Sequence, residues 1–373
     1  LDVFWDSKGL ITAEGFRRFC GPTVLLARLS KQVWLGGETL DIPVEIAHYG
    51  PEDIKNVTPH WRLLGAGDRV EAEGDLPPLN IPTGSNTSLG QIIHPLRDGP
   101  ASMRRLDVSL PGTPVANGWK IWVYPQQLAA TTKVDDMRTV EALDADTMSF
   151  MQEGGRVLLL GDQKSSVLPA YFPTPVWNPF VFGIDTCGML IDAKHPAFAH
   201  FPTEEFTDWQ WWDLLHMGQA FLFNGAPITM RPLAQVIDQP LRCYRMGAIF
   251  EAKVGKGTIV GTSLNLRDDL EKRVVARQLL HSLTSYLASG SCQPQTQLTP
   301  DQLLQIVNGT KFAIMDGKPA LTDIIMDILP AAQWKTDEKG DEKARVWDAA
   351  ADKVVKTTEG FGYKVQHVNP SEW

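Results

Sequence analysis

The hydrophobic pattern of this chain changes its period near residue 117, and this change constrains the fold more than any other feature. Up to that point apolar and polar residues alternate in short runs such as Val33–Leu35, Leu40–Ile46 and Leu106–Leu110, with turn residues between them and no helical stretch. Short alternating strands separated by turns are typical of antiparallel sheets with one buried face. Residues 31–116 therefore predict an immunoglobulin-like β-sandwich.

After residue 117 the pattern is that of an α/β protein. Trp119–Tyr124 is a compact apolar strand, residues 136–153 have a helical pattern that ends at Gly154-Gly155, and Val157–Leu160 is continuously apolar. A strand, a helix with a glycine cap and a fully apolar strand predict a βαβ unit, in which helices cover both faces of a parallel sheet. We therefore expect a three-layer α/β domain over residues 117–290.

The same region contains signals for further elements and one irregular aromatic insertion. Gly255-Lys256-Gly257 predicts a hairpin turn, and Asp268 opens a long amphipathic helix that ends near Gly290. The insertion covers Pro169–Gly225. The remaining expected strands are Pro232–Ile237, Arg242–Lys253 and Thr258–Thr262.

The two ends of the chain differ from these regions. Thr12 can cap a short helix with Phe16, Phe19 and Cys20 on one face, and a helix of this length needs a partner to cover its apolar side. The chain begins at Leu1 rather than Met, so we expect residues 1–30 to be the tail of an upstream domain. Residues 291–373 predict an extension with a capped helix at Thr299–Val307 and the start of a further β-rich module.

Charge and cysteine content exclude several classes of function. With 35 basic and 44 acidic side chains the net charge is -9, which argues against nucleic-acid and membrane partners because these need a basic face. No apolar run is long enough to span a bilayer. The four cysteines are scattered and form neither a metal-binding spacing nor a disulfide framework, and the dispersed histidines match no standard metal site. We predict neither a metal nor a cofactor.

One aromatic and acidic segment, Phe201–Asp213, is the candidate binding site. Flat aromatic faces stack on the C–H surfaces of sugar rings, whereas carboxylates accept hydrogen bonds from sugar hydroxyls. Packing of the tryptophans against the α/β domain is the alternative interpretation. The candidate carbohydrate-binding residues are Glu204, Glu205, Asp208, Trp209, Trp211 and Trp212. Direct catalysis by Glu204 and Glu205 is disfavoured, because adjacent carboxylates do not face each other across a bond.

The order of these parts resembles the C-terminal region of bacterial glycoside hydrolases of the family 2 (β-galactosidase-like) type. The residues that carry the resemblance are Leu1–Cys20, Lys31–His48, Asn117–Pro125, Glu153–Leu160, His195–Phe198, Phe201–Trp212 and Phe250–Gly257. The resemblance implies the tail of a catalytic (β/α) barrel over residues 1–30, then the sandwich. A class I glutamine-amidotransferase-like domain with a flavodoxin-like parallel sheet follows, and this domain lacks its nucleophile.

The family's catalytic pattern is missing from this chain. Such hydrolases carry their acid/base in an Asn-Glu pair, and this sequence contains no Asn-Glu dipeptide. No catalytic residue can be transferred, so we expect an accessory region of a retaining glycosidase whose two carboxylates lie in an upstream barrel, on the same or a separate chain. The role would be support of the barrel, extension of the cleft or assembly, including homo-oligomers. The resemblance favours a periplasmic or secreted bacterial protein, and the cytoplasm also stays open.

Two alternatives remain beside the accessory role. In the first, the region itself binds an oligo- or polysaccharide through the aromatic cluster. In the second and weaker one, it is a divergent amidohydrolase with Cys187 as its nucleophile, although no nearby histidine would activate this thiol.

Overall fold

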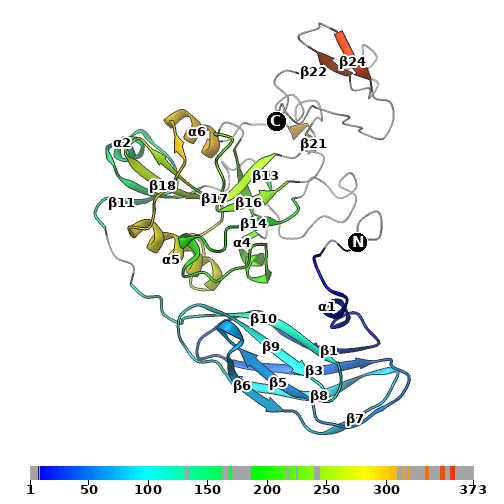
Figure 1. Ribbon diagram of the computed structural model, residues 1–373. Helices are drawn as coiled ribbons and strands as arrows, with labels where there is room; N and C mark the ends of the chain where they lie inside the picture. The colour runs from blue at the N-terminus through cyan, green and yellow to red at the C-terminus, as the bar shows by residue number, and fades with distance from the viewer. Residues whose placement is uncertain are drawn as a thin grey trace.

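The structure, a computed structural model, is that of a multidomain, β-rich protein with several sheets and few helices (Figure 1). It describes residues 7, 9–130, 134–161, 186–215, 218–223, 226–238 and 244–308, and the backbone of 168–169, 314–315, 318–319, 332–335, 345–348 and 353–357. Trp5, Trp177, His216, Cys243 and Trp373 lie outside these residues.

Two sheets enclose one core in the first part of the chain, as the alternating pattern predicts. The three-stranded sheet has the order β1-β3-β8 and the five-stranded sheet the order β2-β10-β9-β5-β6. Ile42 and Ile46 from one sheet and Leu106 and Val108 from the other are fully buried in the shared core. The strands are β1 (Thr23–Ala27), β2 (Val33–Leu35), β3 (Thr39–His48), β5 (His60–Leu64), β6 (Val70–Asp75), β8 (Ser85–Pro95), β9 (Ser102–Ser109) and β10 (Ala116–Tyr124). The strands β4 (Ile54–Val57) and β7 (Leu79–Ile81) form a separate two-stranded sheet, whose Val57 and Ile81 belong to the same core.

Strand β10 corrects one prediction. Trp119–Tyr124 is not the first strand of a βαβ unit: it belongs to the sandwich, antiparallel to β9 and parallel to β2. Its apolar run misled the prediction because both of its faces are buried. Ile121 and Val123 contribute to the sandwich core, whereas Trp122 and Tyr124 contribute to the core of the second sheet.

The second sheet has nine strands and is mixed, so it does not support the expected flavodoxin-like parallel sheet. The strands β11, β12 and β18 are parallel neighbours, with α2 connecting β11 to β12, but β18, β17, β15 and β16 pair antiparallel. The hairpin at Gly255-Lys256 is confirmed, and its short turn is what makes β17 and β18 antiparallel. The strands are β11 (Met137–Val140), β12 (Arg156–Leu160), β13 (Leu168–Pro169), β14 (Met189–Ile191), β15 (Gln219–Leu222), β16 (Ala234–Ile237), β17 (Arg245–Val254), β18 (Gly257–Thr262) and β19 (Gln297–Leu298).

Three helices pack against this sheet. In α2 (Ala145–Glu153), Asp144 Oδ1 accepts a hydrogen bond from Thr147 N at 2.8 Å, and Gly154 closes the helix at φ 118°. The long helix α5 (Val274–Ala288) begins six residues after the expected Asp268, while α6 (Pro300–Asn308) confirms the helix expected near Thr299. Short turns and helices complete the described fold: η1 (Ala66–Asp68), η2 (Pro196–Phe198), η3 (Trp209–Trp211) and α4 (Trp212–Leu215).

Few helices and strands are described at the two ends of the chain. Helix α1 (Ala13–Arg17) is capped by Thr12, as predicted, and the rings of Phe16 and Phe19 contact each other while both remain about half exposed. The C-terminal strands are β20 (Ile314–Met315), β21 (Lys318–Pro319), β22 (Ala332–Lys335), β23 (Arg345–Asp348) and β24 (Lys353–Thr357).

None of the helices in the described part of the chain combines the length and the apolar character that crossing a bilayer requires.

Gly257 offers a test of the contact between the hairpin and α2. A Cβ at this position would lie 2.3 Å from the Gly155 carbonyl oxygen and 2.4 Å from that of Met151, both backbone atoms. We expect Gly257→Ala to destabilise the protein by about 2 kcal/mol, since neither backbone segment can yield cheaply. Urea unfolding should therefore show a clearly lower midpoint concentration for Gly257→Ala than for the wild type. Gly290→Ala, where no atom lies within 4 Å, is the matched control and should leave the midpoint unchanged.

Candidate functional site

The local fold of residues 201–215 is organised by the carboxylate of Asp208. Its Oδ1 caps the η3 turn by accepting from Gln210 N at 3.2 Å, and its Oδ2 accepts from Glu204 N at 3.3 Å and from Gln210 Nε2 at 3.1 Å. Only 6% of Asp208 is exposed. This candidate residue therefore shapes the segment from inside, and hydrogen bonds within the segment occupy its carboxylate.

Burial also alters the acidity of Asp208. Desolvation raises the pKa of this carboxyl from 3.8 to about 6, and the neighbouring Glu204 charge adds to the rise, while the hydrogen bonds from Gln210 and Glu204 N oppose it. The group is ionised at neutral pH, and the folded state holds its proton more tightly than the unfolded chain does.

The segment is attached to strand β10 by three side-chain contacts. Trp122 Nε1 donates to the Pro202 carbonyl at 3.1 Å, Tyr124 donates its hydroxyl hydrogen to Gln210 Oε1, and Lys120 pairs with Glu204. Tyr124 is completely buried, and burial holds the pKa of its phenol well above 10. Because these contacts alternate along β10 at positions 120, 122 and 124, the whole segment lies in register against one face of the strand.

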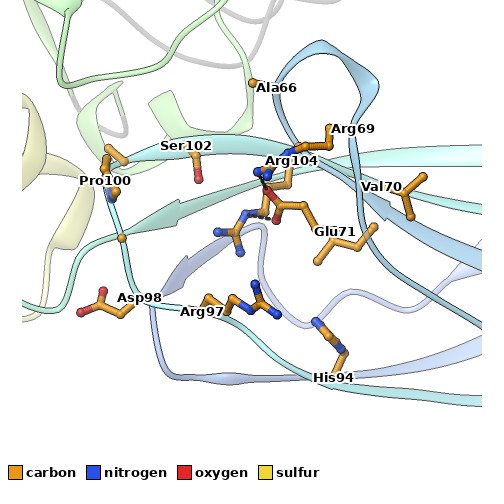
Figure 2. A pocket seen from close by; sticks show the side chains of 14 residues that line it. Ala66, Arg69, Val70, Glu71, His94, Arg97, Asp98, Pro100, Ser102 and Arg104 are labelled. Atoms are coloured by element: carbon orange, nitrogen blue, oxygen red, sulfur yellow. Dashed lines mark hydrogen bonds and ion pairs between the residues drawn. The ribbon is translucent and has the colours of Figure 1, made fainter.

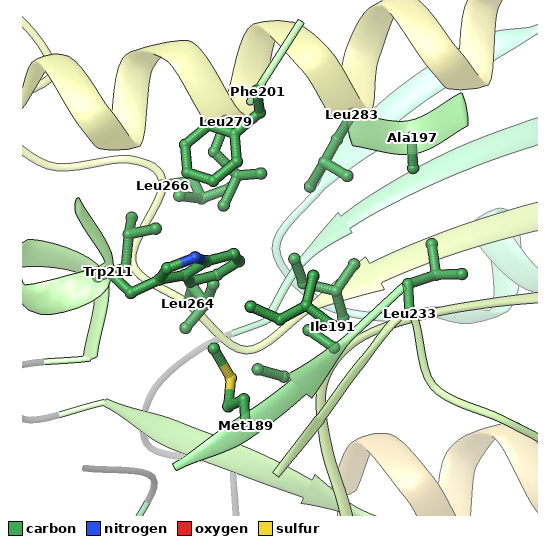
Figure 3. Packing of buried hydrophobic residues seen from close by; sticks show 14 of the residues in the cluster. Met189, Ile191, Ala197, Phe201, Trp211, Leu233, Leu264, Leu266, Leu279 and Leu283 are labelled. Atoms are coloured by element: carbon green, nitrogen blue, oxygen red, sulfur yellow. The ribbon is translucent and has the colours of Figure 1, made fainter. Parts of the chain in front are cut away.

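Trp211 belongs to the core (Figure 3). Its side chain has no exposed surface, its ring packs edge-on against Phe201 with centroids 5.3 Å apart, and its Nε1 donates to Thr203 Oγ1 at 2.9 Å. For this residue the packing interpretation holds, since a buried ring has no face for a sugar.

Trp209 and Trp212 behave differently because the turn projects them outward. They are three residues apart, on the same side of the η3–α4 turn, and are 59% and 46% exposed. Phe206, which the sequence reasoning did not select, is 54% exposed. The structure thus brings two of the predicted aromatic residues to one surface and adds a third ring.

Two open pockets adjoin this surface. The first, here called the Lys120 pocket, has a volume of about 450 Å³ between β10 and the Phe201–Asp208 segment. The second, here called the Arg273 pocket, has a volume of about 430 Å³ between the β2 end of the sandwich and the start of α5. Trp209 and Gln32 line both pockets, so the two adjoin at the Trp209 side chain, and together they are here called the Trp209 groove.

Each pocket combines aromatic surface with polar groups. The Lys120 pocket is lined by Trp119 and Phe206 as well as by the Lys120–Glu204 pair. In the Arg273 pocket Trp212 lies beside an ion pair in which Arg273 Nε donates to both oxygens of Asp213 at 3.0 Å.

Of the predicted carboxylates, Glu204 and the largely buried Asp208 line the Lys120 pocket. Glu205 is exposed but lines neither pocket, and its backbone carbonyl accepts from Ile191 N at 2.9 Å. The groove residues that sequence reasoning missed include Gln32, Trp119, Lys120, Phe206 and Arg273. The alternation of β10 was the only signal for Trp119 and Lys120, and nothing local pointed to Gln32 or Arg273, which come from distant segments.

The cysteine of the amidohydrolase hypothesis is poorly suited to nucleophilic attack. Burial and the charge of Asp238 raise the pKa of the Cys187 thiol, so the reactive thiolate is disfavoured. Among the described residues there is no group of three histidine, cysteine, aspartate or glutamate side chains that could hold a metal ion. His195 Nε2 lies 3.6 Å from Glu251 Oε1, and the imidazole rings of His200 and His281 contact each other.

Two protein-family models match parts of this chain, and both describe domains of unknown function. One domain of unknown function (DUF8488) matches residues 38–125 and a second (DUF8487) matches residues 138–308. The first match ends next to the last residue of β10, in agreement with the place of that strand in the sandwich. No curated protein matches the chain.

Among solved structures the similarities are limited to about a quarter of the chain. They include the sporulation control protein Spo0M from Bacillus subtilis (14% identity, 28% of this chain, 50% of that chain, TM-score 0.22). The alkylpurine DNA glycosylase AlkC from Pseudomonas fluorescens matches at 12% identity (28% and 30% covered, TM-score 0.23). A family 123 glycoside hydrolase from Clostridium perfringens matches at 11% identity (27% and 24% covered, TM-score 0.20). The chain spans half or less of each, and at these scores none supports a functional argument.

The raised pKa of Asp208 predicts how stability varies with pH. Because the folded pKa of about 6 exceeds the unfolded value of 3.8, protonation of Asp208 favours folding, and this contribution is lost as pH rises through 6. Relative to Asp208→Asn, which keeps a capping oxygen but cannot ionise, the wild type should gain on the order of 2 kcal/mol between pH 7.5 and pH 4.

Urea unfolding of both proteins at the two pH values measures this difference, since the other carboxyl groups are common to both and cancel. A difference in unfolding free energy that does not change with pH would contradict the assignment of a buried, proton-binding Asp208.

Proposed function

We propose that this chain binds carbohydrate along the Trp209 groove, as an accessory region of a carbohydrate-degrading protein. The observation that carries the proposal is the pair of outward indole rings, Trp209 and Trp212, on a turn that Asp208 caps from inside. Two large, partly exposed aromatic rings at one groove form a binding surface of the kind that sugars use.

The polar groups of the groove suit a hydroxyl-rich ligand. Gln32 offers both an amide donor and a carbonyl acceptor, while Glu204 and Asp213 offer carboxylate oxygens that remain partly exposed beside their cationic partners. Because each carboxylate is already paired, an uncharged sugar hydroxyl can join the network without leaving a charge unpaired.

The geometry favours binding over catalysis. Glu204 pairs with Lys120 in one pocket and Asp213 with Arg273 in the other, and the two pockets adjoin at the Trp209 side chain. Asp208, the carboxyl with the raised pKa, is directed inward to the η3 turn. A glycosidase needs an acid and a second carboxylate facing each other across one bond, whereas Glu204 and Asp213 are each held by a cation and the Asp208 carboxylate is held by hydrogen bonds within its own segment.

The accessory role rests on the resemblance to the C-terminal region of family 2 glycoside hydrolases. In that reading the sandwich is immunoglobulin-like, and the part of residues 1–30 that precedes β1 is the tail of a catalytic barrel whose retaining chemistry lies outside this chain. The exposed rings of Phe16 and Phe19 supply an apolar face for contact with that barrel. A periplasmic or secreted location follows from the same resemblance.

Carbohydrate binding is tested by titrating the chain with cellohexaose, xylohexaose and β-1,4-galactan oligosaccharides while its tryptophan fluorescence is recorded. We expect saturable binding of at least one sugar, and Trp209→Ala and Trp212→Ala should each weaken it by about tenfold, the equivalent of one lost stacking contact.

Tyr49→Ala, which removes an exposed ring from the sandwich away from the groove, is the matched control and should bind as the wild type does. The proposal is wrong if no oligosaccharide binds, or if the tyrosine variant loses as much affinity as the tryptophan variants.

The accessory role predicts that residues 1–373 do not hydrolyse p-nitrophenyl β-galactoside or related chromogenic glycosides. Since binding and turnover are measured separately, this experiment is independent of the fluorescence titration. Measurable turnover that survives Glu204→Gln and Asp213→Asn would place catalytic groups elsewhere in the chain and contradict the accessory role.

A further inference from the structure

A third pocket, separate from the Trp209 groove, lies at one end of the β-sandwich (Figure 2). It has a volume of about 440 Å³, within the range of sites for small molecules. Its walls come from the β5–β6 connection, from the end of β8, from the loop at 96–101 and from the start of β9. All of these segments belong to the sandwich.

Three arginines converge on this pocket although the chain as a whole is acidic. Arg69, Arg97 and Arg104 all line it, from three different segments of the sandwich. A single carboxylate, Glu71, lies between two of them: its Oε1 is 3.1 Å from Arg69 and its Oε2 is 3.0 Å from Arg104 Nε. Because two guanidinium groups share this one carboxylate, the three side chains together carry a net positive charge.

Arg104 is the group best placed to hold a ligand. Its side chain is 10% exposed, and its Nε lies 3.0 Å from Glu71 Oε2 as an ion pair without making a hydrogen bond in the described part of the chain. Its two terminal nitrogens make no hydrogen bond within the described part of the chain. Both terminal nitrogens can therefore donate to a ligand that accepts hydrogen bonds in the pocket.

Two further features indicate that the pocket suits a ligand that accepts hydrogen bonds. Arg97 makes no hydrogen bond or ion pair with any described residue, and the carboxylate of its neighbour Asp98 points away from it and accepts from Gln126 N at 3.2 Å. The hydroxyl oxygen of Ser102 is buried and has no hydrogen-bond partner in the described part of the chain. Both donors line the same pocket as Arg104.

The electrostatic environment of His94 agrees with this picture. Burial lowers the pKa of its imidazole, the charges of Arg104 and Arg97 lower it further, and Glu71 opposes them. The ring, which also packs against Trp61 with centroids 5.8 Å apart, is therefore neutral at pH 7.5 and can form a hydrogen bond to a ligand.

We propose that this pocket, here called the Arg104 pocket, binds a small molecule through an oxyanion group held by Arg104 and Arg97, with Ser102 and His94 as further hydrogen-bonding partners. Guanidinium groups pair with carboxylate, phosphate and sulfate through parallel hydrogen bonds, and this shared chemistry defines the ligand class. Val70, Pro100 and Ala101 supply apolar surface for the body of the molecule.

Isothermal titration calorimetry at pH 7.5 with sodium phosphate, sodium sulfate and sodium glucuronate tests the proposal, with sodium chloride at equal ionic strength as the reference. The three anions distinguish a phosphate, a sulfate and a carboxylate ligand. We expect saturable binding of at least one, weakened by about tenfold in Arg97→Ala and abolished in Arg97→Glu.

Arg62→Ala is the matched control. Arg62 is exposed on β5 of the same sandwich but does not line the pocket, so its removal changes net charge equally and should leave the affinity unchanged. Equal weakening in Arg62→Ala and Arg97→Ala would reduce the effect to general charge and overturn the site, as would the absence of saturable binding for all three anions.

A local signal identifies where the anion binds. The His94 ring proton resonance, assigned by comparison with His94→Gln, should shift with a saturation curve that gives the same dissociation constant as calorimetry. A His94 resonance that does not move while heat is released would place the anion elsewhere and overturn the proposal. Because Arg97 is exposed and makes no contact that the fold needs, its variants should retain the wild-type urea midpoint.

Discussion

Strand β10 is the element on which the rest of the structure depends, because its two faces are buried in two different cores. Ile121 and Val123 lie in the sandwich core, and Trp122 and Tyr124 in the core of the second sheet. A strand covered on both faces cannot shift its register by one residue without exchanging the side chains of two cores at once. The contacts of Lys120, Trp122 and Tyr124 with residues 202–210 follow from this fixed register. The Trp209 groove therefore forms where the sandwich meets the second sheet.

Much of this architecture could be predicted from the sequence because local rules govern it. Alternation gives the sandwich strands, a left-handed glycine ends α2, and a two-residue turn makes the β17–β18 hairpin. The prediction failed where one local pattern fits two structures. A short apolar run indicates a strand buried on both faces but does not say by what, so β10 was assigned to a parallel sheet. The mixed order of the second sheet depends on pairings between distant strands, which no local pattern encodes.

The candidate site shows the same limit at the level of single residues. Composition identified the Phe201–Asp213 segment, but the direction of each side chain depends on the η3 turn. Trp209 and Trp212 share the outer side, whereas Trp211 enters the core beside Phe201. Asp208 was selected as a ligand for hydroxyls, and it instead holds the turn that positions the two rings. The Arg104 pocket could not be foreseen, since Arg69, Arg97 and Arg104 come from segments that only the sandwich brings together.

The account's central claim is that the outward faces of Trp209 and Trp212 bind sugar. A crystal structure of the chain in complex with the oligosaccharide that binds most tightly tests it directly. The account predicts one pyranose ring stacked on Trp209 and a further sugar unit beside Trp212, with hydroxyls within hydrogen-bond distance of Gln32 and Asp213. Sugar density at any other surface, with both indole faces bare at saturating ligand, would contradict it.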